Sequence, residues 1–345
     1  MKHAASWLAL SMVPLACAHA PEAPPPQVTL GGTPGAPAIA IPAAVPEPPP
    51  ALLAAPASAR IETPARPAPA KEGPSCDGAP GAGRDCNEES CCLRLEVAGG
   101  DFDMKLDSGS GSARAHVASF AMDKYEVTVG RIRAWVRAGQ PAPAEGEVLY
   151  DDGKRPPVRW PGKVALVQSE KQLAGWKRYD TWTGGEERRP KNSINWYTAA
   201  AFCRFDGGRL PTDAEWKYAA VGGDEQRPYP WGAEPPTPER AVYNCTGDGD
   251  KSCSLADLLP VGSRPLGAGR WGHMDLAGSV FEWTLNGATA EGAGGDEETS
   301  RGGGFCYIGG VDRRAQTGLR PLVFRKESAS TQSHMVGARC AYDRK

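Results

Sequence analysis

The residues best suited to chemistry in this chain lie between Asp275 and Trp283. Asp275 and Glu282 offer carboxylate oxygens, and the backbone carbonyls of Gly278 and Val280 lie between them. A hard cation such as calcium takes several oxygen ligands, often from one folded loop. The pattern is compatible with a calcium site, and the alternative is a capped turn whose carboxylates are solvated.

The second candidate is Cys306, a lone cysteine that several arginines follow. A thiolate can bind a metal or act as a nucleophile, and a basic neighbourhood lowers the pKa of a thiol. Cys306 could equally be half of a disulfide or an inert buried thiol, because cysteine is among the most buried residue types. The residues alone leave these roles open; the arginines that follow are Arg313, Arg314 and Arg320.

Other cysteines suggest disulfides. Cys245 and Cys253 are eight residues apart around a turn rich in Gly and Asp, and we expect them to pair. Four more gather where the domain begins, and the last two are adjacent, so a bond between those two would close a strained ring. The cysteines that we expect to hold this N-terminal loop are Cys76, Cys86, Cys91 and Cys92.

The first 20 residues are typical of an export signal, with a basic start, a short apolar core and the small-x-small site Ala18-His19-Ala20. A lipoprotein signal ending at Cys17, which would carry the lipid anchor, is the alternative. Residues 21–75 are nearly all Pro, Ala, Gly and Val, which predicts a disordered linker before a domain at 76–345. We expect an exported protein in the periplasm, at the outer-membrane surface or outside the cell.

Composition limits the kinds of partner that we expect for this chain. The formal net charge of −2 gives no basic field for phosphates, so nucleic-acid binding is not expected. No apolar run reaches the roughly 18–20 residues that span a bilayer, so we expect no transmembrane helix in the mature chain. Of the 10 cysteines, loss or lipidation of Cys17 leaves an odd number. One cysteine should then lie outside the intrachain disulfides or bond to another chain.

Three helices are predicted from their start and stop signals. Thr128 should cap the first, which Gly139 ends. Asn195 should cap the second, and Thr212 and Glu215 form a capping box for the third. The rest of the chain, with 42 Gly and 33 Pro, predicts short strands and long loops.

Several segments, in this order, together resemble the formylglycine-generating enzyme (sulfatase-modifying factor) domain, from about residue 91 to the C-terminus. The most specific are Gly208–Ala220, Asp275–Trp283 and Gly337–Ala341. Val97–Met104 resembles the family's opening hairpin, with Ala98 in place of proline. Shorter matching pieces are Asp123–Val129, Asn192–Trp196, Tyr229–Gly232 and Arg301–Phe305.

The resemblance implies an α+β fold related to C-type lectins, with little regular secondary structure. It implies a disulfide between Cys203 and Cys340. It also places calcium at one loop, whose ligands here would be Asp275, Gly278, Val280 and Glu282.

The active oxidases of this family bind copper through two cysteines and convert a substrate cysteine to formylglycine. Soft sulfur ligands suit Cu(I). Those cysteines stand five residues apart, after a Gly-Gly-Ser segment. Here the segment is Gly302–Gly304 without the serine, Cys306 comes one residue early, and Val311 stands where a second cysteine would follow it.

These departures favour a non-catalytic cell-envelope module that binds a peptide, a glycan or a partner protein in the ancestral peptide groove. The alternative is a divergent metal-dependent oxidase that acts on protein cysteine, with Cys306 as its copper ligand. A purely structural envelope component is the third hypothesis. The binding module and the oxidase differ in whether turnover accompanies binding.

Overall fold

The computed structural model describes residues 72–105, 111–151, 153, 157–162, 178–250, 252–285, 297–306, 319–321 and 324–344. By contacts the chain separates into residues 1–68 and 69–345, and all described residues lie in the second unit. The expected signal peptide, Cys17 and most of the linker lie outside the described residues. So do Val311, Arg313 and Arg314.

One sheet brings the end of the chain beside its early strands. Its order is β1-β4-β11, and both pairings are antiparallel. The central strand β4 is buried along its whole length, which fits its place between two neighbours. The strands are β1 (Arg94–Val97), β4 (Phe120–Asp123) and β11 (Ala341–Asp343).

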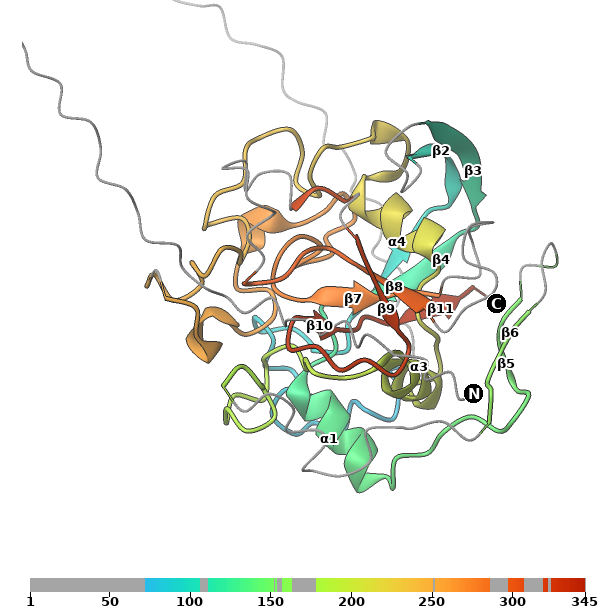
Figure 1. Ribbon diagram of the computed structural model, residues 1–345, viewed down its shortest axis with the longest axis horizontal. Helices are drawn as coiled ribbons and strands as arrows, with labels where there is room; N and C mark the ends of the chain where they lie inside the picture. Colours follow the sequence, from blue (N-terminus) through green and yellow to red (C-terminus); the bar gives the residue numbers. More distant parts are fainter. Residues whose placement is uncertain are drawn as a thin grey trace, which may run out of the picture. The chain divides into compact units, whose positions relative to one another are not determined.

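A second, mixed sheet lies near the middle of the domain (Figure 1). Its order is β10-β7-β8-β9; β10 runs parallel to β7, and the other pairings are antiparallel. β7 carries the Phe281-Glu282-Trp283 part of the predicted calcium loop. The strands are β7 (Phe281–Trp283), β8 (Glu297–Arg301), β9 (Phe324–Ser328) and β10 (Val336–Gly337).

Two hairpins complete the strands, and one of them corrects the sequence analysis. The expected strand, turn and strand over Val97–Met104 are present, but the two strands do not pair: β1 joins β4, whereas β2 (Gly100–Lys105) joins β3 (Ser112–Val117). Gly99 between them packs so tightly that a Cβ there would lie 2.3 Å from the Val117 carbonyl oxygen. The other hairpin joins β5 (Val148–Tyr150) to β6 (Val158–Arg159).

The three predicted helices are confirmed, with their caps. Thr128 caps α1 (Val129–Arg137), and Asn195 caps α3 (Trp196–Phe205) by accepting the Thr198 N–H at 2.9 Å. Thr212 and Glu215 form both bonds of the capping box of α4 (Asp213–Ala220). Short 3-10 helices occur at Gly223–Glu225, Leu255–Asp257 and Pro265–Gly267.

The largest hydrophobic core lies between α1, α3 and the β7 sheet, where Trp135, Phe202 and Trp283 are almost wholly buried. Two tryptophans of the long segment between the first and second helices, Trp160 and Trp182, are 3% and 5% exposed and join this core. Both indole rings therefore help to fill the core. Trp176 lies outside the described residues.

Four disulfides hold the domain together: Cys76–Cys92, Cys86–Cys91, Cys203–Cys340 and Cys245–Cys253. Adjacent Cys91 and Cys92 bond to different partners, as expected. The Cys203–Cys340 bond joins α3 to the residue just before β11. Cys306 is the cysteine of the described chain that lies outside these bonds, and it is buried.

Ser75, the last residue of the expected linker, packs against the domain. Ser75 is fully buried, its N–H donates to Asp206 at 2.9 Å, and its hydroxyl accepts from Arg131 at 3.0 Å. At least this residue of the expected linker therefore belongs to the domain. Among the described residues, no helix is long and apolar enough to cross a bilayer.

Candidate functional site

Arg339 lies at the centre of the site and is fully buried. Its guanidinium donates to the Glu282 carboxylate from two nitrogens, with the shortest N–O distance 2.7 Å. It also donates to the backbone carbonyls of Asp123, Lys124 and Met274 at 2.6–3.0 Å. One side chain thus connects β4, β7 and the residue before the Asp275 loop.

Glu282 does not fit the calcium site that the resemblance implies. Both of its oxygens accept from Arg339, and one also accepts the Trp216 indole N–H at 2.7 Å. A fixed cation therefore already neutralises this carboxylate. Asp275 accepts the Gly262 N–H at 2.6 Å, and no carboxylate oxygen of either residue is among the buried atoms left unbonded in the described chain.

A third carboxyl, Glu126, lies against the same loop and was missed by the sequence analysis. It accepts from the Ser279 hydroxyl at 3.0 Å and from the Val280 N–H at 3.2 Å. Burial raises its pKa well above the usual range, and the negative charges of Asp275 and Glu282 add to that rise. Burial likewise raises the pKa of Asp275 to about 6. One arginine therefore faces a group of acidic side chains, and the pKa values of Glu126 and Asp275 are both raised.

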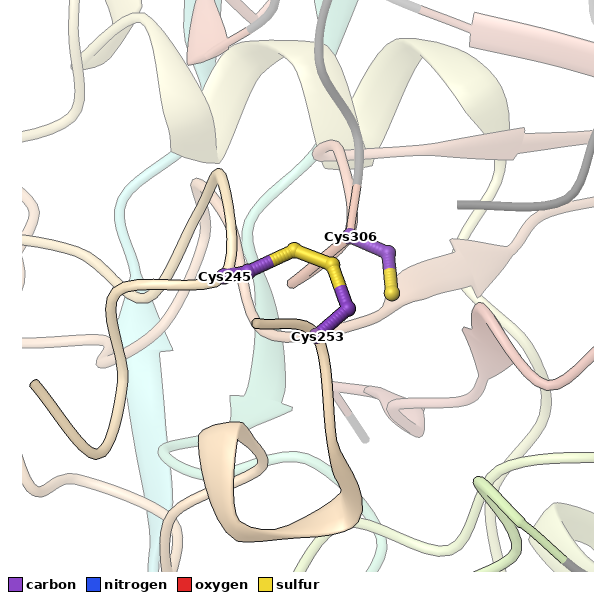
Figure 2. Close-up of side chains that lie close together, drawn as sticks. All are labelled: Cys245, Cys253 and Cys306. Atoms are coloured by element: carbon purple, nitrogen blue, oxygen red, sulfur yellow. A yellow bond between two sulfur atoms is a disulfide. The ribbon is translucent and has the colours of Figure 1, made fainter. Parts of the chain in front are cut away.

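Cys306 lies beside the Cys245–Cys253 disulfide (Figure 2). The three sulfur atoms all lie within 4.8 Å of one another, and we call these residues the sulfur cluster. Cys245, Cys253 and Cys306 are 1%, 6% and 5% exposed. The cluster is the second arrangement in this part of the fold that could do chemistry.

Backbone hydrogen bonds through Phe305 fix the sulfur cluster in place. The Phe305 N–H donates to the Ser279 carbonyl at 2.7 Å, and the Cys245 N–H donates to the Phe305 carbonyl at 2.9 Å. The segment that ends at Cys306 therefore lies between the Asp275–Trp283 loop and the loop of Cys245. The two sequence-predicted sites are neighbours.

Phe305 also belongs to an aromatic wall, which it forms with Tyr179 and His334. Tyr179 stacks on His334 with ring centroids 5.1 Å apart, and Phe305 lies 6.1 Å from Tyr179. Asn192 holds this pair by donating to the backbone carbonyls of Tyr179 and His334 at 2.6 and 2.7 Å. The sequence carried no signal for this wall, because its members come from three distant segments.

Comparison with known proteins places this arrangement in a family. The sulfatase-modifying factor enzyme 1-like domain matches residues 83–344. The chain belongs to this family. The match begins a few residues after Cys76, close to where the resemblance begins in the sequence.

Relatives within the sulfatase-modifying factor family include proteins whose names state opposite activities. The chain is 30% identical over 265 residues to a Mus musculus protein named inactive C-alpha-formylglycine-generating enzyme 2, covering 72% of this chain and 84% of that protein. It is 26% identical over 275 residues to a Bos taurus formylglycine-generating enzyme, covering 70% and 71%. The solved structure of PvdO from Pseudomonas aeruginosa has a similar fold, with TM-score 0.50 at 17% identity over 79% of this chain and 98% of PvdO.

Replacing Glu282 tests whether it serves Arg339 or a calcium ion. We expect Glu282→Gln to lower the unfolding free energy by about 3–5 kcal/mol, because one partner of a buried ion pair is lost. The measurement is chemical denaturation, with calcium and with a chelator. The loss of unfolding free energy should be equal with calcium and with the chelator, since Arg339 is the partner of Glu282.

The matched control is Glu96→Gln, which removes an exposed ion pair with Arg344. Such pairs contribute about 0–1 kcal/mol, so a small effect is expected. If the cost of Glu282→Gln vanished in the chelator, Glu282 would be a calcium ligand instead.

Lys191, next to Asn192, predicts a pH dependence. Burial lowers its pKa to about 8 from 10.5, although Asp180 acts in the opposite direction. Between pH 8 and 10.5 the unfolded chain therefore binds the proton more readily, and stability from this group rises with pH. Below pH 8 the lysine is charged in both states and the burial cost is fully present. We expect Lys191→Met to lose this rise when unfolding free energy is measured against pH.

The exposed Lys326→Met variant controls for the loss of a lysine. The slope of its unfolding free energy against pH should match that of the unchanged protein. Identical slopes for all three proteins would show that burial of Lys191 does not govern the dependence.

Proposed function

We propose that this protein is an exported, non-catalytic member of the sulfatase-modifying factor family. It binds a peptide, a glycan or another protein through the surface that the family's oxidases use for their substrate peptide. The observation that carries the proposal is the state of the cysteines. Eight of them form four disulfides, Cys17 lies in the expected signal, and Cys306 is buried.

Copper chemistry in the family needs two thiolates at one site, and this chain supplies one. The sulfurs nearest to Cys306 belong to a disulfide, which has no thiolate to offer. At 5% exposure, Cys306 is also poorly placed to meet the cysteine of a substrate peptide. The relative named inactive has 30% identity with this chain, which agrees with a member of the family that has lost the chemistry.

The first experiment measures oxidation of a cysteine peptide. The purified protein is incubated with copper, a reductant, oxygen and the peptide, and products are read by mass spectrometry. We expect no aldehyde product and no oxygen consumption above that of Cys306→Ser, because a single buried thiol cannot form the two-coordinate site. An active formylglycine-generating enzyme under the same conditions is the positive control.

Turnover that disappears in Cys306→Ser would replace this proposal with the divergent oxidase. The binding half is read separately, by titrating the protein with peptides and glycans selected on arrays. A ligand that saturates without turnover supports the binding module. Arrays with no saturable ligand would instead support the purely structural role.

The relation to C-type lectins stays a prediction from the resemblance.

Export is the second part of the proposal. Intact mass and N-terminal sequencing of protein from membrane and soluble fractions test export. We expect a chain that starts after Ala20, or at a lipidated Cys17, because both cleavage patterns are present in the sequence. A chain that keeps Met1 would contradict export.

A further inference from the structure

We propose that Cys306 and the Cys245–Cys253 disulfide form a thiol–disulfide exchange site. In it, the Cys306 sulfur replaces one of the two bonded cysteines and releases the other as a thiol. The inference concerns the sulfur cluster alone and does not depend on what the protein binds.

Proximity is the first support. The three sulfurs lie within 4.8 Å of one another, and a disulfide bond is about 2 Å long, so the attacking sulfur need move by less than about 3 Å. Figure 2 shows the Cys306 side chain alongside the bridge. The Cys245 N–H bond to the Phe305 carbonyl fixes two of the three backbones at a short distance.

The second support is that the loop carrying the disulfide has other contacts to hold it. Asp257 is fully buried and accepts the N–H groups of Gly247 and Ser254, both at 2.9 Å, from either end of the loop. Arg264 donates to the Gly247 carbonyl at 3.0 Å. Cys245 and Cys253 therefore stay close together when the bond between them opens.

The step balances without any other reactant. The Cys306 thiol loses its proton to solvent, and the thiolate attacks one sulfur of the bridge. A bond forms from Cys306 to that sulfur while the Cys245–Cys253 bond breaks, and the displaced thiolate takes up a proton. One thiol and one disulfide remain, so no oxidant or reductant is consumed.

Exchange changes which segments are joined covalently. In the structure the bond closes the local loop between Cys245 and Cys253. After exchange it would join that loop to the segment that follows β8 and ends at Cys306. The site is thus a switch between a local and a long-range crosslink.

The test is a disulfide map of the folded full-length protein after acid quenching and alkylation of thiols in denaturant. We expect the alkyl label on Cys306 and also on Cys245 or Cys253, together with peptides that join Cys306 to the other cysteine. Cys306→Ser should show only the Cys245–Cys253 bond. The distant Cys203–Cys340 bond should stay intact in both proteins. Label confined to Cys306 would overturn the proposal.

Two further variants give an independent reading. In Cys245→Ser and Cys253→Ser, oxidised glutathione should drive the two remaining cysteines of the sulfur cluster into a bond with each other. Circular dichroism identifies the variants that fold. A folded variant whose two cysteines both remain alkylated as thiols would contradict the proposal, and the map of the unaltered protein decides where neither variant folds.

Discussion

The burial of one charged guanidinium constrains most of this domain. A buried arginine is costly unless its donors all find acceptors, and Arg339 finds them in Glu282 and three backbone carbonyls. Those acceptors lie at the end of β4, in β7 and just before the Asp275 loop. Cys340, the residue after Arg339, is bonded to Cys203 of α3. These segments must therefore lie together around Arg339, and this shared constraint helps to fix the positions of short strands and long loops.

Local signals made the helices predictable, whereas long-range partners did not. The caps at Thr128, Asn195 and Thr212 each depend on residues within one turn, which a sequence displays directly. The role of Glu282 depends on a residue 57 positions away. A carboxylate in an oxygen-rich loop looks the same whether its partner is calcium or arginine. The pairing of β1 with β4 rather than β2 is likewise decided by distant packing.

The sulfur cluster shows the same limit for the site. The sequence predicted the Cys245–Cys253 bond from spacing and left Cys306 open between several roles. It could not bring them together, because their proximity depends on long-range contacts such as the backbone bonds of Phe305 to Ser279 and Cys245. The family fold is present here with a single thiol beside a disulfide, so the fold by itself does not establish the chemistry of this position.

The N-terminal disulfides also decide how the domain would carry a mechanical load. A pull on the chain before Ser75 would first load the bonds of Ser75 to Asp206 and Arg131, and would then pass through the Cys76–Cys92 bond to the residue before Leu93 and β1. The intervening loop is a closed covalent ring and would carry no tension. The load would then reach Arg94, which donates hydrogen bonds to the carbonyl and the carboxylate of Asp206 at the end of α3. A domain pulled at this end would resist as one body rather than unravel from its terminus.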